Sequence, residues 1–248
     1  MDGVIYDSMS NHALAWHESM GDYGLDMPLS AAYEYEGMRG TETIQLLTRR
    51  QWGRTVTDAE AQEMYREKSR RFAALCQQRP VTVMPGVRTL MEQIKACGMK
   101  ICVVTGSGQH TLLDRLLSDF PGLVTPQLMV TAHDVTHGKP HPEPYIIGMR
   151  KCGAAPFESV VVENAPLGVR AAHAARCFTI AVNSGPLADA ALTAEGADVV
   201  FPRMTSLSAQ FSSFLSAGGL SISLSRLMLS SPMRVSRMTS GMYSSLCG

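Results

Sequence analysis

The sequence predicts an α/β fold, namely a doubly wound, Rossmann-like parallel sheet into which an all-helical domain is inserted. From residue 99 onward, short apolar runs rich in β-branched residues alternate with amphipathic helical segments. Continuous hydrophobicity indicates strands that are buried on both faces, as in parallel sheets. Strand–helix–strand repeats at this spacing are typical of right-handed βαβ units. Before residue 82 the pattern is helical and contains no strong strand, so we expect a separate helical domain there.

Each element of the α/β part has its own signal. Gly98, Gly153 and Gly196 stand where glycine commonly ends a helix. The expected strands are 99–105, 128–131, 159–163, 178–183 and 198–201. The expected helices are 86–97, 109–117, 143–152, 167–175 and 187–194.

The order of the elements also predicts the domain boundaries. We expect a discontinuous core domain of residues 1–7 and 83–211, and a helical cap domain of residues 8–82. Within the cap, residues 58–75 form the longest amphipathic candidate, with Thr57 or Asp58 as its N-cap. Residues 212–248 are rich in Ser, Met and Gly and lack acidic residues, so we expect a disordered tail.

Composition excludes several classes of partner. The formal net charge of the 248 residues is zero, which gives no reason to expect nucleic acid or an anionic membrane as a partner. Apolar runs stay shorter than the ~20 residues that a membrane span needs. The 6 cysteines are scattered and include no Cys-x-x-Cys pair, which favours reduced thiols in a cytoplasmic protein. We also expect a monomer.

Four polar motifs follow one another in the chain, and three of them leave expected strands. The carboxyl ends of strands are where an open α/β sheet binds its ligand. The motifs are Met1-Asp2-Gly3-Val4, Val103-Val104-Thr105-Gly106-Ser107-Gly108, Gly138-Lys139-Pro140-His141-Pro142-Glu143-Pro144-Tyr145 and Val160-Val161-Val162-Glu163-Asn164-Ala165-Pro166-Leu167-Gly168.

These motifs supply the groups that a phosphate and a magnesium ion need. Thr105 offers a hydroxyl, and the backbone N–H groups of Gly106 and Ser107 at a helix start suit a phosphate. Lys139 adds a positive charge, and Glu163-Asn164 offers oxygen ligands for Mg²⁺. Each motif alone could be a turn, a solvated loop charge or a helix cap. Their occurrence together and in order favours a site for phosphate and Mg²⁺ that also includes the Asp2 carboxylate.

In this order the motifs resemble those of the haloacid dehalogenase superfamily over residues 1–211, in its β-phosphoglucomutase-like branch. The family motif is Asp-x-Asp-Gly, so Met1 takes the x position and Asp2 that of the second aspartate. The first aspartate, which is the nucleophile, would immediately precede Met1. We therefore expect an N-terminal truncation, and we expect the printed chain to be inactive because it lacks this nucleophile.

The resemblance also implies roles for the remaining residues. A phosphoaspartate would form on the missing nucleophile, with Asp2 as general acid and base. Thr105 and Lys139 would hold the transferring phosphoryl group. Mg²⁺ would be bound by Asp2, Glu163 and Asn164, with Asn164 in place of the aspartate that is common there.

The cap sequence bears on the substrate. His12 and Trp16 resemble the cap entry of β-phosphoglucomutase, where the histidine couples cap closure to acid–base chemistry, although they could equally form one packed helix face. Glu36 resembles the cap glutamate of a bacterial inorganic pyrophosphatase of this branch, which implies that Glu36 reaches the metal; it could also be a solvated loop residue. Arg39 and His12 are further candidates for substrate binding.

The predicted function is therefore Mg²⁺-dependent phosphohydrolysis with a preference for pyrophosphate or another small phosphate. β-Phosphoglucomutase is the alternative enzyme, but Gly108 and Glu36 occupy positions where the mutases carry basic residues. A catalytically dead, truncated chain is the third possibility.

Overall fold

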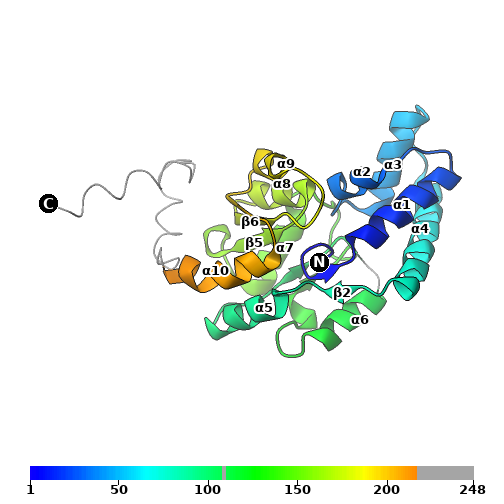
Figure 1. Ribbon diagram of the computed structural model, residues 1–248. Helices are drawn as coiled ribbons and strands as arrows, with labels where there is room; N and C mark the ends of the chain where they lie inside the picture. Colours follow the sequence, from blue (N-terminus) through cyan, green and yellow to red (C-terminus); the bar gives the residue numbers. More distant parts are fainter. Residues whose placement is uncertain (108–109, 217–248) are drawn as a thin grey trace.

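The computed structural model describes residues 1–107 and 110–216 and confirms the α/β fold with its helical cap (Figure 1). The strands are β1 (Tyr6–Asp7), β2 (Thr82–Val83), β3 (Val103–Val104), β4 (Met129–Val130), β5 (Val160–Glu163), β6 (Phe178–Val182) and β7 (Val199–Phe201). The α-helices are α1 (Met9–Asp22), α2 (Leu29–Glu34), α3 (Gly40–Gln51), α4 (Asp58–Gln78), α5 (Val87–Ala96), α6 (His110–Asp119), α7 (Glu143–Cys152), α8 (Pro166–Ala174), α9 (Asp189–Ala194) and α10 (Met204–Ser216). Short 3₁₀ turns, Pro126–Leu128 and Pro156–Glu158, precede β4 and β5.

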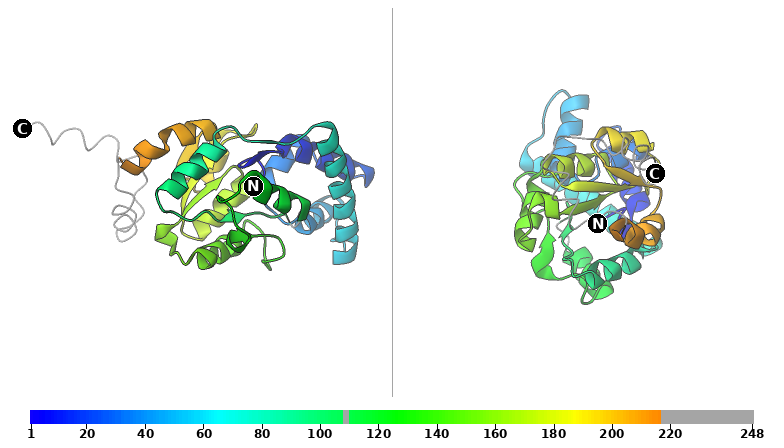
Figure 2. Two further views of the ribbon diagram at one scale, coloured as in Figure 1. Left: turned by 90° about the horizontal axis from the view of Figure 1, so that it is seen from below. Right: turned by 90° about the vertical axis from the view of Figure 1, so that its left-hand side faces the viewer.

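The core strands form two parallel ladders. Strand β6 lies between β5 and β7 with parallel pairing on both sides. Strand β3 pairs in parallel with β4. In Figure 2 the strands lie between layers of helices, as a doubly wound sheet requires. Each expected strand of residues 99–201 is present, but shorter at its ends, because only the central residues of each run make ladder hydrogen bonds.

The cap helices α1 to α4 gather on one side of the core (Figure 1). Their interior is apolar and includes Trp16, Met20, Ile44 and Met64. Helix α4 begins after Thr57, whose hydroxyl accepts the Glu60 N–H while the Glu60 carboxylate accepts the Thr57 N–H. This capping box selects Thr57 over Asp58 as the N-cap.

Two short antiparallel strands connect the core to the cap. Tyr6 pairs with Val83 and Asp7 with Thr82. The chain therefore leaves the core and returns to it side by side, at the crossings expected near residues 8 and 82. Residues 1–107 and 110–216 contain no helix with the length and apolar character that crossing a lipid bilayer requires.

The expected start of a disordered tail at residue 212 is wrong, because helix α10 continues to Ser216. Leu207 and Phe211 of this helix are buried in the main core cluster together with Leu90 of α5. Burial of that apolar face stabilises the helix beyond what its serine-rich composition indicates. The remainder of the expected tail, residues 217–248, lies outside the described residues.

Candidate active site

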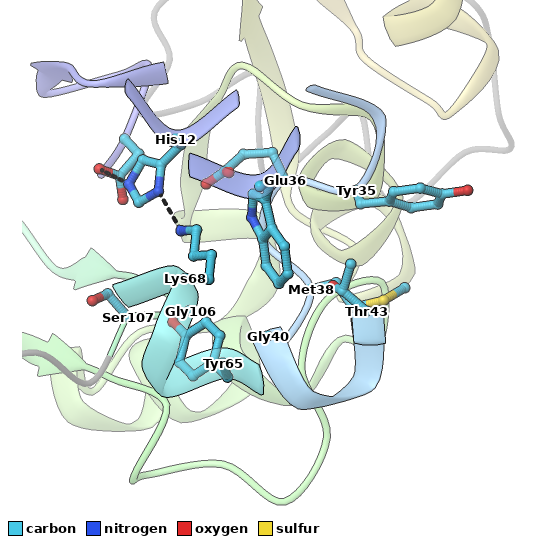
Figure 3. A pocket seen from close by; sticks show the side chains of 13 residues that line it. His12, Tyr35, Glu36, Met38, Gly40, Thr43, Tyr65, Lys68, Gly106 and Ser107 are labelled. Atoms are coloured by element: carbon cyan, nitrogen blue, oxygen red, sulfur yellow. Dashed lines mark hydrogen bonds and ion pairs between the residues drawn. The ribbon is translucent and has the colours of Figure 1, made fainter. Parts of the chain in front are cut away.

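A small cavity of about 50 Å³ lies where the cap meets the core. The core contributes Asp2, near the start of the chain, and two residues that follow β3. The cap contributes residues of α1, α3, α4 and the loop between α2 and α3 (Figure 3). The residues that line the cavity are Asp2, His12, Trp16, Tyr35, Glu36, Gly37, Met38, Gly40, Thr43, Tyr65, Lys68, Gly106 and Ser107. Among the candidate site residues, the structure brings Asp2, His12, Glu36, Gly106 and Ser107 together around this cavity.

Asp2 is a buried carboxylate held in one position by two neighbours. Ser8 donates a hydrogen bond of 2.6 Å to Asp2 Oδ1, and His12 Nε2 lies 3.2 Å from the same oxygen. Burial alone would raise the pKa of Asp2, but His12, the nearby terminal amine and the Ser8 hydroxyl outweigh it and lower the pKa. Asp2 is thus oriented and charged at the edge of the cavity.

Lys68 of α4 fixes the orientation of His12. Its Nζ lies 2.7 Å from His12 Nδ1 (Figure 3). An ammonium has only donors, so Nδ1 accepts and the ring proton sits on Nε2, facing Asp2. The His12 ring also stacks on Phe72 with a centroid distance of 3.8 Å. Burial, the largest cause, and the Lys68 charge lower the pKa of His12, and the Asp2 carboxylate offsets only part of this effect.

The sequence prediction missed Lys68, although a signal was present. Its side chain is only 2% exposed, on the same face of α4 as Met64 and Phe72. Lys68 is four residues away from each of these apolar residues, so it interrupts the apolar face of an amphipathic helix. A buried lysine needs a specific partner. Burial lowers the pKa of Lys68 to about 8, and the carboxylates of Glu36 and Asp2 offset only part of that effect.

A second buried polar cluster joins Lys139 to Glu163. The Lys139 ammonium and the Tyr145 hydroxyl both donate to Glu163 Oε1. Glu163 Oε2 accepts the backbone N–H of Asn164 at 3.1 Å. Burial opposes ionisation of Glu163, but the positive charge of Lys139 outweighs it and lowers the pKa of this carboxyl. Glu163 is therefore engaged in positioning Lys139, and sequence reasoning also missed Tyr145 as its third member.

The residues expected to bind phosphate lie at the end of β3 and in the loop that follows it. Thr105 is buried at the end of β3, and its hydroxyl accepts the Ser107 N–H at 3.1 Å. Gly106 lies directly below the cap, since a Cβ there would approach the Gly37 carbonyl oxygen to 3.2 Å. Gly106 and Ser107 line the cavity, whereas Thr105 stabilises the loop through its hydrogen bond with the Ser107 N–H. Gly108, which follows in this motif, lies outside the described residues.

Glu36 and Arg39 both belong to the cap loop between α2 and α3, but their side chains have different surroundings. Glu36 lines the cavity and faces the His12–Lys68 pair (Figure 3), and burial together with the Asp2 charge raises its pKa to about 7. Arg39 instead points away from the cavity lining. Its Nη1 donates to the Thr136 carbonyl at 2.8 Å, and Glu42 lies 3.9 Å away. Arg39 thus connects the cap to the loop that carries Lys139.

The donor set near Asp2 fits a hard divalent cation. Asp2 and Asn164 are both buried and offer oxygen atoms, and the Asn164 side chain packs directly on Gly3, where a Cβ would approach its Nδ2 to 2.1 Å. The negative charge of Asp2 contributes to the raised pKa of Glu36, so these two carboxylates are close enough to interact. Oxygen donors of this kind suit Mg²⁺. Glu163 is less available than the sequence indicates, because Lys139 and Tyr145 occupy one of its oxygens.

Comparison with known proteins agrees with this geometry. Residues 1–182 match the haloacid dehalogenase-like hydrolase family. A solved structure described as a putative β-phosphoglucomutase from Bacteroides vulgatus superposes with a TM-score of 0.82 at 44% identity, covering 88% of this chain and 87% of that one. Hexitol phosphatase A of Escherichia coli is 30% identical over 184 residues, 74% of this chain and 81% of that protein. β-Phosphoglucomutase of Bacillus subtilis is 26% identical over 190 residues, 75% of this chain and 81% of that protein.

The family match spans both parts of the fold, since residues 1–182 include the whole cap and the core as far as the end of β6. The site residues Asp2, Thr105, Lys139, Glu163 and Asn164 all lie within it. The chain therefore belongs to the haloacid dehalogenase-like hydrolases, in their β-phosphoglucomutase-like branch.

Proposed function

We propose that the protein is a Mg²⁺-dependent phosphohydrolase that prefers inorganic pyrophosphate or another small phosphate. The observation that carries this proposal is the buried Asp2 carboxylate, which Ser8 and the Lys68–His12 pair orient at the edge of a cavity. A carboxylate fixed in this way is suited to take a proton from an attacking water, and the carboxyl that results can give that proton to a leaving oxygen. Buried Lys139 nearby would neutralise charge on the phosphoryl oxygens.

The nucleophile in this proposal is an aspartate bonded to the nitrogen of Met1, as the Asp-x-Asp-Gly motif of the family implies. Met1 itself is buried in the main core cluster. The carboxylate of the aspartate that precedes it would attack phosphorus as the bond from phosphorus to the leaving oxygen breaks, and Asp2 in its protonated form would give that oxygen its proton.

Asp2, Asn164 and Glu36 would hold the magnesium ion, with Glu163 beside them. When bound, Mg²⁺ neutralises charge on the phosphoryl oxygens. The protein's own contribution is positional: Thr105 and Ser107 shape the loop whose N–H groups meet the phosphate, and Tyr145 and Glu163 hold the Lys139 ammonium.

Three features support a small substrate. Glu36 occupies the cavity wall, and a second carboxylate there disfavours a sugar phosphate unless a metal lies between them. The cavity is small, at about 50 Å³. Arg39, a candidate for substrate binding, donates a hydrogen bond to the Thr136 carbonyl instead. Together these features favour pyrophosphate over a hexose bisphosphate.

A sugar-phosphate phosphatase or mutase is the second candidate, and the relatives favour it. The curated relatives include hexitol phosphatase A and a β-phosphoglucomutase, and the 44% identical structure is described as a putative β-phosphoglucomutase. Opening of the cap would enlarge the cavity, and Arg39 would then be released from Thr136 to meet a second phosphate.

Phosphate release with Mg²⁺ tests both candidates. We would assay the printed chain and a form with an aspartate and an apolar strand added before Met1, on pyrophosphate, hexitol phosphates and β-glucose 1-phosphate. We expect activity only in the extended form, with pyrophosphate giving the highest kcat/KM. A higher kcat/KM for a hexitol phosphate, or interconversion of glucose phosphates, would replace the pyrophosphatase proposal with the second candidate. Equal activity of both forms would overturn the assignment of the nucleophile.

A further inference from the structure

The loop that carries Lys139 presents three ligand-type side chains on its outer side. Lys139 is buried toward Glu163, whereas the side chains of His137 and His141 are 62% and 51% exposed. Glu143, the first residue of α7, approaches both rings with its Oε2. This is the one group of three or more His, Cys, Asp or Glu side chains in residues 1–107 and 110–216 whose potential ligand atoms lie close together.

The distances within this group are close to those of a metal site. His137 Nδ1 lies 3.0 Å from Glu143 Oε2, and His141 Nδ1 lies 3.9 Å from the same oxygen. One ligand atom from each residue can be chosen so that all lie within 4.8 Å of one another. Ligands bound to Zn²⁺ at 2.0–2.1 Å in tetrahedral geometry are separated by about 3.3 Å, so small side-chain rotations suffice.

The carboxylate of this group is already held in place. Glu143 Oε1 accepts the Thr136 N–H at 2.8 Å, and Oε2 accepts the His137 N–H at 2.9 Å. These bonds fix the carboxylate without occupying all of its lone pairs. The His141 ring is also held in place, because its Nδ1 accepts the Glu143 N–H at 3.2 Å. Its Nε2 remains as an alternative ligand atom. Fixed ligands lower the entropy cost of binding an ion.

The chemistry of the donors selects the metal. Two imidazoles and one carboxylate suit Zn²⁺ and similar transition ions, whereas Mg²⁺ takes oxygen ligands. On binding, the His137 ring would move its proton to Nε2 and coordinate through Nδ1, with no net change in charge on the ring. We propose that His137, His141 and Glu143 form a Zn²⁺ site on the outer side of the Lys139 loop, separate from the magnesium site, with water completing the coordination.

Zn²⁺ titration of the tag-free protein, in excess Mg²⁺ to saturate oxygen sites, tests this proposal. We expect calorimetry to detect a Zn²⁺ equivalent that His137→Ala and His141→Ala each weaken by more than about tenfold. His133→Ala, which removes an exposed imidazole from the same segment, is the matched control and should leave affinity unchanged. Equal Zn²⁺ affinity in all four proteins would overturn the proposal, as would loss of binding in the control alone.

Co²⁺ gives a second readout that does not depend on affinity. An imidazole–carboxylate site produces visible d–d bands without the near-ultraviolet thiolate charge-transfer band that a cysteine ligand would add. We expect these bands in the unmodified protein and in His133→Ala, and their loss in the His137→Ala/His141→Ala double variant. A thiolate band that persists in the double variant would assign the ion to cysteine and refute the site. Circular dichroism of each variant verifies that it is folded.

Discussion

Lys68 Nζ lies 2.7 Å from His12 Nδ1, although the two residues are 56 positions apart on different cap helices. The opposite ring nitrogen of His12 lies 3.2 Å from the Asp2 carboxylate of the core. A chain of contacts thus runs from α4 through α1 to the residue proposed as general acid and base. These contacts join the cap to the core, so the position of the cap determines whether His12 lies against Asp2.

Lys68→Met should impair the chemical step more than substrate binding. Without the ammonium, His12 Nδ1 loses its donor, and the ring can adopt the other tautomer and release Asp2. In the form that releases phosphate in the assay described above, we expect kcat to fall by about 10²-fold, in the range of general acid–base contributions, with a smaller change in KM. Lys100→Met, at an exposed lysine bonded to the Cys152 carbonyl, is the control. A change in KM alone would argue for a substrate-binding role instead.

The same substitution should change how stability depends on pH. The pKa of Lys68 is about 8 in the folded chain and 10.5 ordinarily, because burial disfavours its charged form. Between these values the unfolded chain binds more protons, so the free energy of unfolding rises with pH. We expect wild type to gain up to about 3 kcal/mol relative to Lys68→Met between pH 8 and 10.5. Urea unfolding at several pH values measures this, and parallel curves for the two proteins would contradict it.

Glu36→Gln should lower activity on pyrophosphate selectively. Gln keeps the size of the side chain but removes the charge that is proposed to bind Mg²⁺. We expect kcat/KM for pyrophosphate to fall by about 10–100-fold, and the Mg²⁺ concentration for half-maximal activity to rise. Glu34→Gln, at an exposed carboxylate two residues earlier, should have no effect. Unchanged Mg²⁺ dependence in Glu36→Gln would show that Glu36 does not bind the ion.

Gly37→Ala should disturb Lys139 directly. Gly37 has φ +88°, and a Cβ there would lie 2.7 Å from Lys139 Cδ. Gly53→Ala is a matched control, because Gly53 has φ +70° but nothing within 4 Å of its Cβ position. Both variants should lose about 1 kcal/mol of stability from backbone strain. Only Gly37→Ala should also lose activity, by about tenfold or more, as Lys139 shifts from the phosphoryl group. Equal activity in both variants would mean that the cap loop accommodates the added methyl group at residue 37 without moving Lys139.

The sequence by itself determined the architecture and most of the candidate site. Continuous apolar runs alternating with amphipathic segments can be buried only in a parallel sheet between helices, and each expected core strand is present. Polar residues directly after the strands had to meet at one edge of the sheet, which predicted Asp2, Thr105 and Asn164 as neighbours of the site. These inferences depend on short-range periodicity, which the order of residues records directly.

Only the tertiary structure decided which side chain each polar group contacts. It placed Lys68 on His12, assigned Glu163 to Lys139 and Tyr145, and turned Arg39 to Thr136 rather than into the cavity. It also extended α10 past residue 212, because Phe211 is buried in the core. Such contacts join residues far apart in sequence, and they depend on how the cap packs against the core, which local periodicity and residue type do not encode.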